Sequence, residues 1–164
     1  HRYKDTGIIL TGGVDDIWQD TITGQLIIVD YKSQAKNGRV DKKDYLDDPF
    51  HEGYKIQMDF YAYLLSGMGF SVHPTSYFLV CNAKRDEDEF NKTMRFDEYL
   101  VPYKWSNDWI ESRLDEMVAL MNQLEVPESN HSCKNCAYAD QYSKIIFSGN
   151  TSQKEITQGT LPLF

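Results

Sequence analysis

The sequence of 164 residues contains few cysteines and no long apolar run. Its three cysteines are an odd number with one close pair, so we expect no disulfide framework and predict a reducing, cytoplasmic location. No apolar run approaches the roughly 18 residues of a membrane span, and the N-terminus lacks a signal-peptide pattern. The sequence therefore predicts no contact with a membrane.

A lysine- or arginine-rich block is also missing, and the formal net charge is −8. Phosphate neutralisation supplies most of the non-specific affinity for nucleic acid, so this charge argues against strong stand-alone DNA binding. It does not argue against a metal-dependent nuclease, because an acidic cluster takes up cations before it accepts a phosphate. A small positive rim is still expected from Lys32, Lys36, Arg39, Lys42 and Lys43.

The length and the apolar fraction of 41% predict a single globular domain over residues 1–164, with a polar C-terminal tail at 149–164. The chain opens with His1 and no methionine, which we interpret as a segment cut from a longer protein. Hydrophobic periodicity and turn residues predict strands at 8–18, 25–32, 75–81 and 93–103, helices at 52–68 and 107–124, and a polar loop at 33–51. This order predicts an α/β fold in which helices flank a mixed sheet.

Two acidic residues and one lysine lie in neighbouring apolar stretches, Thr11-Gly-Gly-Val-Asp-Asp-Ile17 and Leu26-Ile-Ile-Val-Asp-Tyr-Lys32. Asp30 and Lys32 are two residues apart, so on a strand both side chains point to the same face. With Asp15 they could hold Mg²⁺ or Mn²⁺, to which the backbone carbonyl of Tyr31 could add a ligand. Such a cation activates water and polarises a phosphate, which suits phosphodiester hydrolysis. The alternative is a solvated Asp-x-Lys at a strand end.

These stretches resemble the core of the PD-(D/E)XK nuclease superfamily. Downstream, Gln57-Met-Asp-Phe-Tyr61 resembles the Gln-x-x-x-Tyr motif of its RecB-like branch, which includes helicase-coupled and CRISPR-associated exonucleases. The resemblance implies a restriction-endonuclease-like αβα sandwich with a central mixed β-sheet. It also implies catalytic roles for Asp15, Asp30, Lys32 and Gln57, and DNA binding by Tyr61. Asp16 is the rival of Asp15, but the family spacing read from Gly12 favours Asp15.

The resemblance further implies a metal-dependent DNA nuclease, in particular an exonuclease of DNA repair, recombination or phage DNA metabolism, with a helicase or other fused subunit as partner. One family element is missing, because only six residues precede Gly7 where an N-terminal helix is expected. The alternative is therefore a catalytically inactive nuclease-like module that binds DNA or a partner protein.

A second candidate metal site is His131-Ser-Cys-Lys-Asn-Cys136, in which His131, Cys133 and Cys136 could bind zinc because a tight turn brings both thiolates together. An iron–sulfur cluster, which RecB-like relatives often carry, is not expected because four cysteine ligands are not available. Two free thiols are the simpler interpretation.

The tail Gln158-Gly-Thr-Leu-Pro-Leu-Phe164 resembles the peptides by which bacterial replication and repair proteins dock on the sliding clamp. Apolar anchors on a polar tail suit insertion into a partner's pocket. The alternative is a tail that packs on its own domain.

Overall fold

A computed structural model describes residues 1–85, 92–125, 127–130 and 132–148. The chain divides into two units, His1–Met117 and Val118–Phe164. The first unit holds the sheet and most of the buried residues, and the predicted candidate active site lies within it. The prediction of a single domain over residues 1–164 stays a prediction.

Four strands form one mixed sheet in the order β1-β2-β3-β4. The strands are β1 (Asp16–Gln19), β2 (Leu26–Gln34), β3 (Thr75–Ala83) and β4 (Phe96–Lys104). β1 and β2 form an antiparallel hairpin, β2 and β3 are parallel, and β3 and β4 are antiparallel. The predicted α/β fold with a mixed sheet and flanking helices is confirmed.

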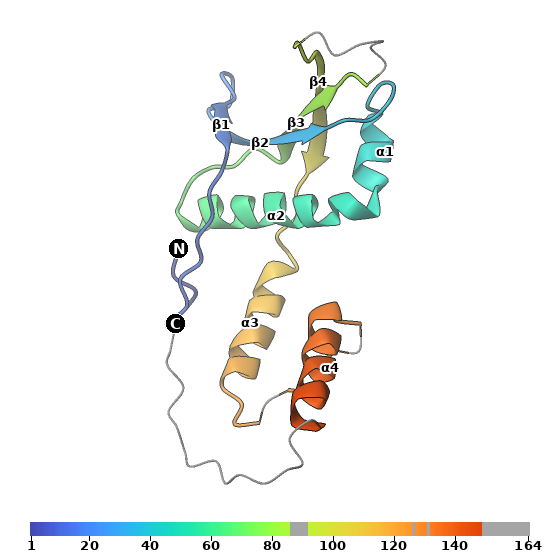
Figure 1. The fold of residues 1–164 in the computed structure, drawn as a ribbon. Helices are drawn as coiled ribbons and strands as arrows, with labels where there is room; N and C mark the ends of the chain where they lie inside the picture. Colours follow the sequence, from blue (N-terminus) through green and yellow to red (C-terminus); the bar gives the residue numbers. More distant parts are fainter. Residues whose placement is uncertain (86–91, 126, 131, 149–164) are drawn as a thin grey trace. The chain divides into compact units, whose positions relative to one another are not determined.

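The parallel pair requires a crossover connection, which the helical segment between β2 and β3 provides. It contains α1 (Lys42–Asp47), a short 3₁₀ helix η1 (Pro49–His51) and α2 (Glu52–Gly67), and α2 lies along one face of the sheet (Figure 1). After β4 come α3 (Ile110–Met121) and α4 (Lys134–Ser148). None of the described helices has the length and apolar character needed to cross a membrane.

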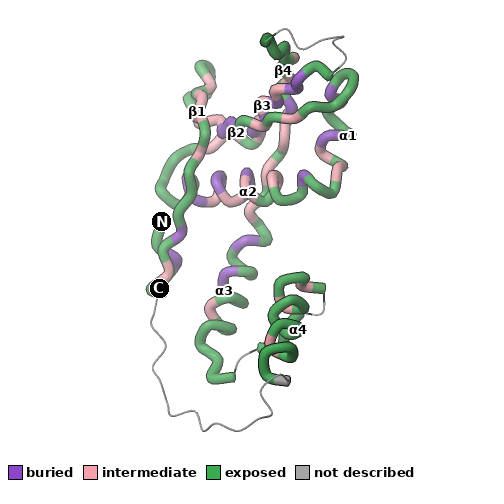
Figure 2. The backbone as a smooth tube through the Cα atoms, in the orientation of Figure 1, coloured by how far each residue is buried: buried purple, intermediate pink, exposed green. Residues whose placement is uncertain are grey.

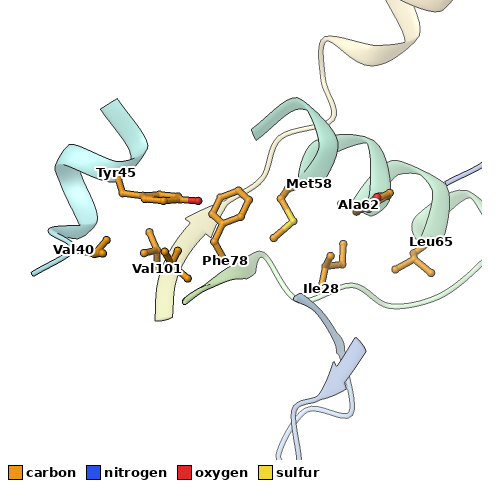
Figure 3. Close-up of a cluster of buried hydrophobic side chains, with 10 residues drawn as sticks. Ile28, Val40, Tyr45, Met58, Ala62, Leu65, Phe78 and Val101 are labelled. Atoms are coloured by element: carbon orange, nitrogen blue, oxygen red, sulfur yellow. The ribbon is translucent and has the colours of Figure 1, made fainter. Parts of the chain in front are cut away.

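The hydrophobic core lies between α2 and the sheet face that carries Ile28, Phe78 and Val101 (Figure 3). On α2, Met58, Ala62 and Leu65 follow helical spacing and pack against that face. Figure 2 shows that buried residues concentrate on β2, β3 and α2. The core therefore fixes α2 against β2, and these are the two elements that carry most of the candidate site.

Two predictions of secondary structure are wrong, and one helix was not predicted. The strand predicted at 8–18 is reduced to β1, because the chain at Gly12 and Gly13 passes over α2 and pairs with no strand. The loop predicted at 33–51 contains α1 and η1, which are capped by the side chains of Asp41 and Asp48. The C-terminal region contains α4, which the sequence analysis did not predict.

Candidate active site

The β1–β2 hairpin brings Asp15 beside Asp30. Asp16 pairs with Val29 in the antiparallel register, so the next pair along the hairpin is Asp15 and Asp30. The backbone N–H of Tyr31 donates a hydrogen bond of 2.9 Å to Asp15 Oδ2, which holds this carboxylate against β2. Burial is the main cause that raises the pKa of Asp30, and the charge of the neighbouring Asp15 raises it further.

Asp30 is buried, with 1% of its surface exposed, at the end of the apolar part of β2. Lys32 Nζ lies 2.5 Å from Asp30 Oδ2 and forms an ion pair with it. Burial nevertheless raises the pKa of Asp30, against the opposing effect of Lys32. Apart from the Lys32 ammonium group against Oδ2, neither Asp30 oxygen has a hydrogen-bond partner among the described residues, so this buried carboxylate is only partly satisfied by its own protein.

Lys32 is held in place by α2. Its Nζ donates a hydrogen bond of 3.1 Å to Gln57 Oε1 and lies 4.4 Å from the ring centroid of Tyr54. Gln57 Nε2 in turn donates to the hydroxyl of Tyr61 at 2.6 Å. Tyr54, Gln57 and Tyr61 stand at positions i, i+3 and i+7 of one helix, so they share one face. This face gives Lys32 two contacts that restrict its rotamer.

The hydroxyl of Tyr61 links α2 to the segment before β1 by donating a hydrogen bond to the carbonyl oxygen of Gly13. Gly12 passes so close to the ring that a Cβ atom there would lie 2.9 Å from Tyr61 Cε1. The Gly-Gly pair therefore lets the segment before β1 approach α2. Tyr61 is 6% exposed, and both hydrogen bonds engage its hydroxyl within the chain.

Asp16, the rival to Asp15, lies on the other face of the hairpin. Its Oδ2 accepts hydrogen bonds from the Tyr31 hydroxyl at 2.6 Å and from Trp18 Nε1 at 2.9 Å. These bonds lower the pKa of Asp16, the one from Tyr31 most. The geometry therefore favours Asp15 over Asp16 as the partner of Asp30. The side chain of Tyr31 points away from the site, while its carbonyl belongs to the stretch between Asp30 and Lys32.

The donor atoms fit a hard divalent cation. Asp15 and Asp30 supply two adjacent carboxylates, and among the described residues the buried Asp30 oxygens have no partner other than the Lys32 ammonium group. Within that same part of the chain, no group of three or more His, Cys, Asp or Glu residues could hold a metal ion. A set of two carboxylates is enough for Mg²⁺, which keeps several waters and takes further oxygens from substrate phosphate.

The sequence analysis did not identify two residues that lie near the site, Tyr54 and Tyr45. Tyr54 could have been found from its helical spacing to Gln57 and Tyr61. Tyr45 is 4% exposed, and among the described residues its buried hydroxyl has no hydrogen-bond partner. Burial raises the pKa of Tyr45, and so does the charge of Asp30. No sequence signal in the polar segment before α2 indicated that Tyr45 would be buried near Asp30.

The remaining predictions concern the C-terminal unit. Cys133 precedes α4, and the backbone N–H of Cys136 donates to Cys133 Sγ at 3.4 Å. This contact lowers the pKa of the Cys133 thiol. His131 and the segment Gln158–Phe164 lie outside the described residues. Zinc binding and clamp docking therefore stay predictions.

A family model of the PD-(D/E)XK nuclease superfamily matches residues 2–141. The match covers most of the chain, and the chain therefore belongs to the PD-(D/E)XK nuclease superfamily. Membership implies nuclease activity, that is hydrolysis of phosphodiester bonds, and members generally use divalent metal ions such as Mg²⁺. Searches of the curated proteins and of the solved structures found no match.

Proposed function

We propose that this protein is a Mg²⁺- or Mn²⁺-dependent deoxyribonuclease. The observation that carries the proposal is the convergence of Asp15, Asp30 and Lys32 at the end of the β1–β2 hairpin. A buried carboxylate with a raised pKa lowers the stability of the fold, and groups of this kind cluster at functional sites. Cation binding by this pair of carboxylates is such a function.

In this proposal, Asp15 and Asp30 bind the cation, and the carbonyl of Tyr31 adds a ligand. When bound, the cation would polarise a phosphate oxygen and lower the pKa of a bound water. Lys32 donates hydrogen bonds to the attacking water or to a non-bridging phosphate oxygen, and so stabilises negative charge that develops in the transition state.

Gln57 has two tasks in the proposal. Its Oε1 accepts from Lys32 Nζ and fixes the position of the ammonium group, and its amide also helps to orient the water. Tyr61 holds Gln57 through its hydroxyl. The DNA contact predicted for Tyr61 requires this hydroxyl to exchange one of its two partners for the substrate.

The finer assignments rest on motif resemblance. Gln57 and Tyr61 support the RecB-like branch, and that branch supports exonuclease activity in DNA repair, recombination or phage DNA metabolism. A helicase or other partner subunit, and a sliding-clamp contact through Gln158–Phe164, belong to the same proposal.

The alternative, an inactive module that binds DNA or a partner, predicts no hydrolysis. The presence of the carboxylate pair, the lysine and the glutamine in one cluster supports the enzyme instead. The test is incubation of wild type with linear DNA and Mn²⁺, alongside Lys32→Ala and the matched control Lys104→Ala on an exposed end of β4.

We expect degradation by wild type and by Lys104→Ala, and a loss of at least roughly 100-fold in Lys32→Ala, the effect of one removed charge-stabilising donor. Intact DNA with all three proteins, together with retained DNA binding, would support the inactive module. Accumulation of mononucleotides or short ends from linear DNA, with closed circular DNA left uncut, would support an exonuclease.

A further inference from the structure

Three adjoining hollows surround the segment that joins β2 to α1. The largest has a volume of about 700 Å³ and is lined by Arg39, Lys42 and Lys43, with Tyr99 and Leu100 as an apolar wall. A second, of about 250 Å³, is lined by Gln34, Lys36, Arg39 and Tyr45 among others. A third, of about 220 Å³, is lined by Lys36, Arg39 and Lys84 among others. We call this surface the basic cleft, defined by Lys36, Arg39, Lys42, Lys43 and Lys84.

The segment 36–43 of the basic cleft carries a local excess of positive charge in an acidic protein. Residues 36–43 contain four basic residues and one acidic residue, although the whole chain carries a net charge of −8. The acidic residue, Asp41, accepts hydrogen bonds from the backbone N–H groups of Lys43 and Asp44 at the start of α1. Its charge is therefore partly engaged by the backbone. Asp44, Asp97 and Glu98 also line the hollows.

The cations of the cleft differ in how far acidic side chains neutralise them. Lys36 pairs with Asp48 at 3.1 Å, and Lys84 pairs with Asp97 at 3.2 Å. Across the described residues, no carboxylate lies within ion-pair distance of Arg39, Lys42 or Lys43, and all three are exposed. These three therefore offer positive charge to a ligand from outside the chain.

The loop that carries Lys36 and Arg39 is fixed by a buried amide. Asn82, at the end of β3, is 2% exposed. Its Oδ1 accepts from the N–H of Lys36 at 2.9 Å, and its Nδ2 donates to the carbonyls of Lys36 and Gly38 at 3.0 and 3.3 Å. Gly38 has a φ of +79°, which suits glycine and completes the turn. The cleft is therefore built from a tethered loop.

The cleft adjoins the candidate active site through β2 and Tyr45. Asp30, Lys32 and Gln34 alternate along β2 and share one face, and Gln34 lines the second hollow. Tyr45 also lines that hollow, and its ring lies 5.8 Å from the ring of Phe78, which is paired with Asp30 in the β2–β3 register. A chain with regularly spaced negative charges could therefore extend from the active site into the cleft.

We propose that the basic cleft binds the phosphodiester backbone of the DNA strand that enters the active site. Arg39 suits bidentate hydrogen bonding to a phosphate, and Lys42 and Lys43 supply point charges. Tyr99 offers an apolar surface to a sugar or a base. The cleft positions the substrate by its backbone and reads no sequence. This inference rests on the proposed function, because it extends the same substrate beyond the site of hydrolysis.

The test compares the triple variant Arg39→Ala/Lys42→Ala/Lys43→Ala with the control Lys92→Ala/Lys104→Ala/Arg113→Ala, which removes the same charge from exposed positions outside the cleft. Binding of a fluorescein-labelled oligonucleotide, single-stranded or duplex, is followed by anisotropy in EDTA at several NaCl concentrations. Cleavage of the same oligonucleotide is then measured with Mn²⁺. Thermal melting checks that each variant is folded, and Lys42→Ala/Lys43→Ala is the fallback variant.

We expect the cleft variant to bind at least roughly tenfold more weakly than the control, with the slope of log K against log salt smaller by about 2 to 3. With Mn²⁺, the KM for DNA should rise while kcat changes little. Equal binding and equal salt slopes in both triple variants would overturn the proposal, even if the wild type cleaves DNA. Salt-dependent binding that needs the cleft, in a protein that never cleaves, would instead overturn the nuclease function and leave the cleft as a DNA site.

Discussion

Asp30 and Asp59 are both buried carboxylates of the first unit, but their surroundings differ. Asp59, on α2, accepts hydrogen bonds from the Tyr103 hydroxyl, the backbone N–H of Ser106 and Trp109 Nε1, at 2.9, 3.0 and 2.9 Å. Asp30, on β2, has the ion pair with Lys32 and, among the described residues, no further hydrogen-bond partner.

We interpret the difference as that between a structural carboxylate, Asp59, and the proposed metal ligand, Asp30. Asp59 ties α2 to the end of β4 and to the residues before α3, and its donors compensate for the loss of water. Asp30 has one charged partner, the ammonium group of Lys32, yet burial still raises its pKa, so this carboxylate is less fully compensated than Asp59. A bound cation would supply the missing compensation. Burial alone therefore does not distinguish a structural carboxylate from a candidate metal ligand, and it is the incomplete compensation of Asp30 that supports the proposed role.

The largest expected effect is on catalysis by Asp30→Asn. The substitution keeps the shape and removes the charge that binds the cation. We expect cleavage of linear DNA with Mn²⁺ to fall by at least about 1,000-fold, since a catalytic metal supplies several kcal/mol of transition-state stabilisation. Circular dichroism melts should show a melting temperature equal to or above that of wild type. A variant that still cleaves at a tenth of the wild-type rate would remove Asp30 from the site.

Asp59→Ala should lower stability and leave cleavage nearly unchanged, the opposite of Asp30→Asn. It leaves three donors without their acceptor, which we expect to lower the free energy of unfolding by about 3 kcal/mol. Urea denaturation measures this loss. Cleavage per folded molecule should stay within about threefold of wild type, because the hydrogen bonds of Asp59 come from Tyr103, Ser106 and Trp109, which lie outside the candidate site. A selective loss of activity with unchanged stability would contradict the structural role.

The stability difference between Asp30→Asn and wild type should depend on pH. Burial raises the pKa of Asp30, so the folded protein binds this proton more tightly than the unfolded chain, whose carboxyl pKa is about 3.9. Below a pH of about 3.9, protonated Asp30 contributes its full share to the stability of wild type. This contribution is lost as the pH rises through the higher pKa of the folded protein. In urea melts with EDTA, the advantage of Asp30→Asn should therefore grow as pH rises through this window. An advantage that shrinks instead would show that the pKa of Asp30 is lowered.

The smallest effect is expected at Tyr54, whose ring lies against Lys32. Tyr54→Leu removes a cation–π contact worth about 0.5 to 2 kcal/mol, so we expect kcat to fall by roughly 3- to 30-fold. Tyr54→Phe keeps the ring and should cleave at nearly the wild-type rate. Equal losses in both variants would assign the effect to the hydroxyl instead of the ring.

The sequence predicted the hairpin and its site because both rest on local patterns. Alternation along 25–32 places Asp30 and Lys32 on one face, and the turn at Thr23-Gly24 brings Asp15 next to them. The structure places these side chains together with Gln57, as the motifs indicated. Their catalytic roles stay proposals until they are measured.

Other features depend on contacts between distant residues, which no local pattern reveals. The strand predicted before Asp16 is shortened because Gly12 packs on Tyr61, which lies 49 positions further along the chain. The six-residue α1 lies in a polar segment. The side chain of Asp41 caps its start, and the burial of Tyr45 fixes its position. The donors around Asp59 come from β4 and the residues after it, so its burial could not be predicted from α2 alone.

The most direct test of the central claim is titration of Mn²⁺ into the protein, followed by isothermal calorimetry or by the electron paramagnetic resonance of free Mn²⁺. We expect wild type and Asp59→Asn to bind the cation, and Asp15→Asn and Asp30→Asn to lose this binding. Equal Mn²⁺ binding by wild type and Asp30→Asn would contradict the account.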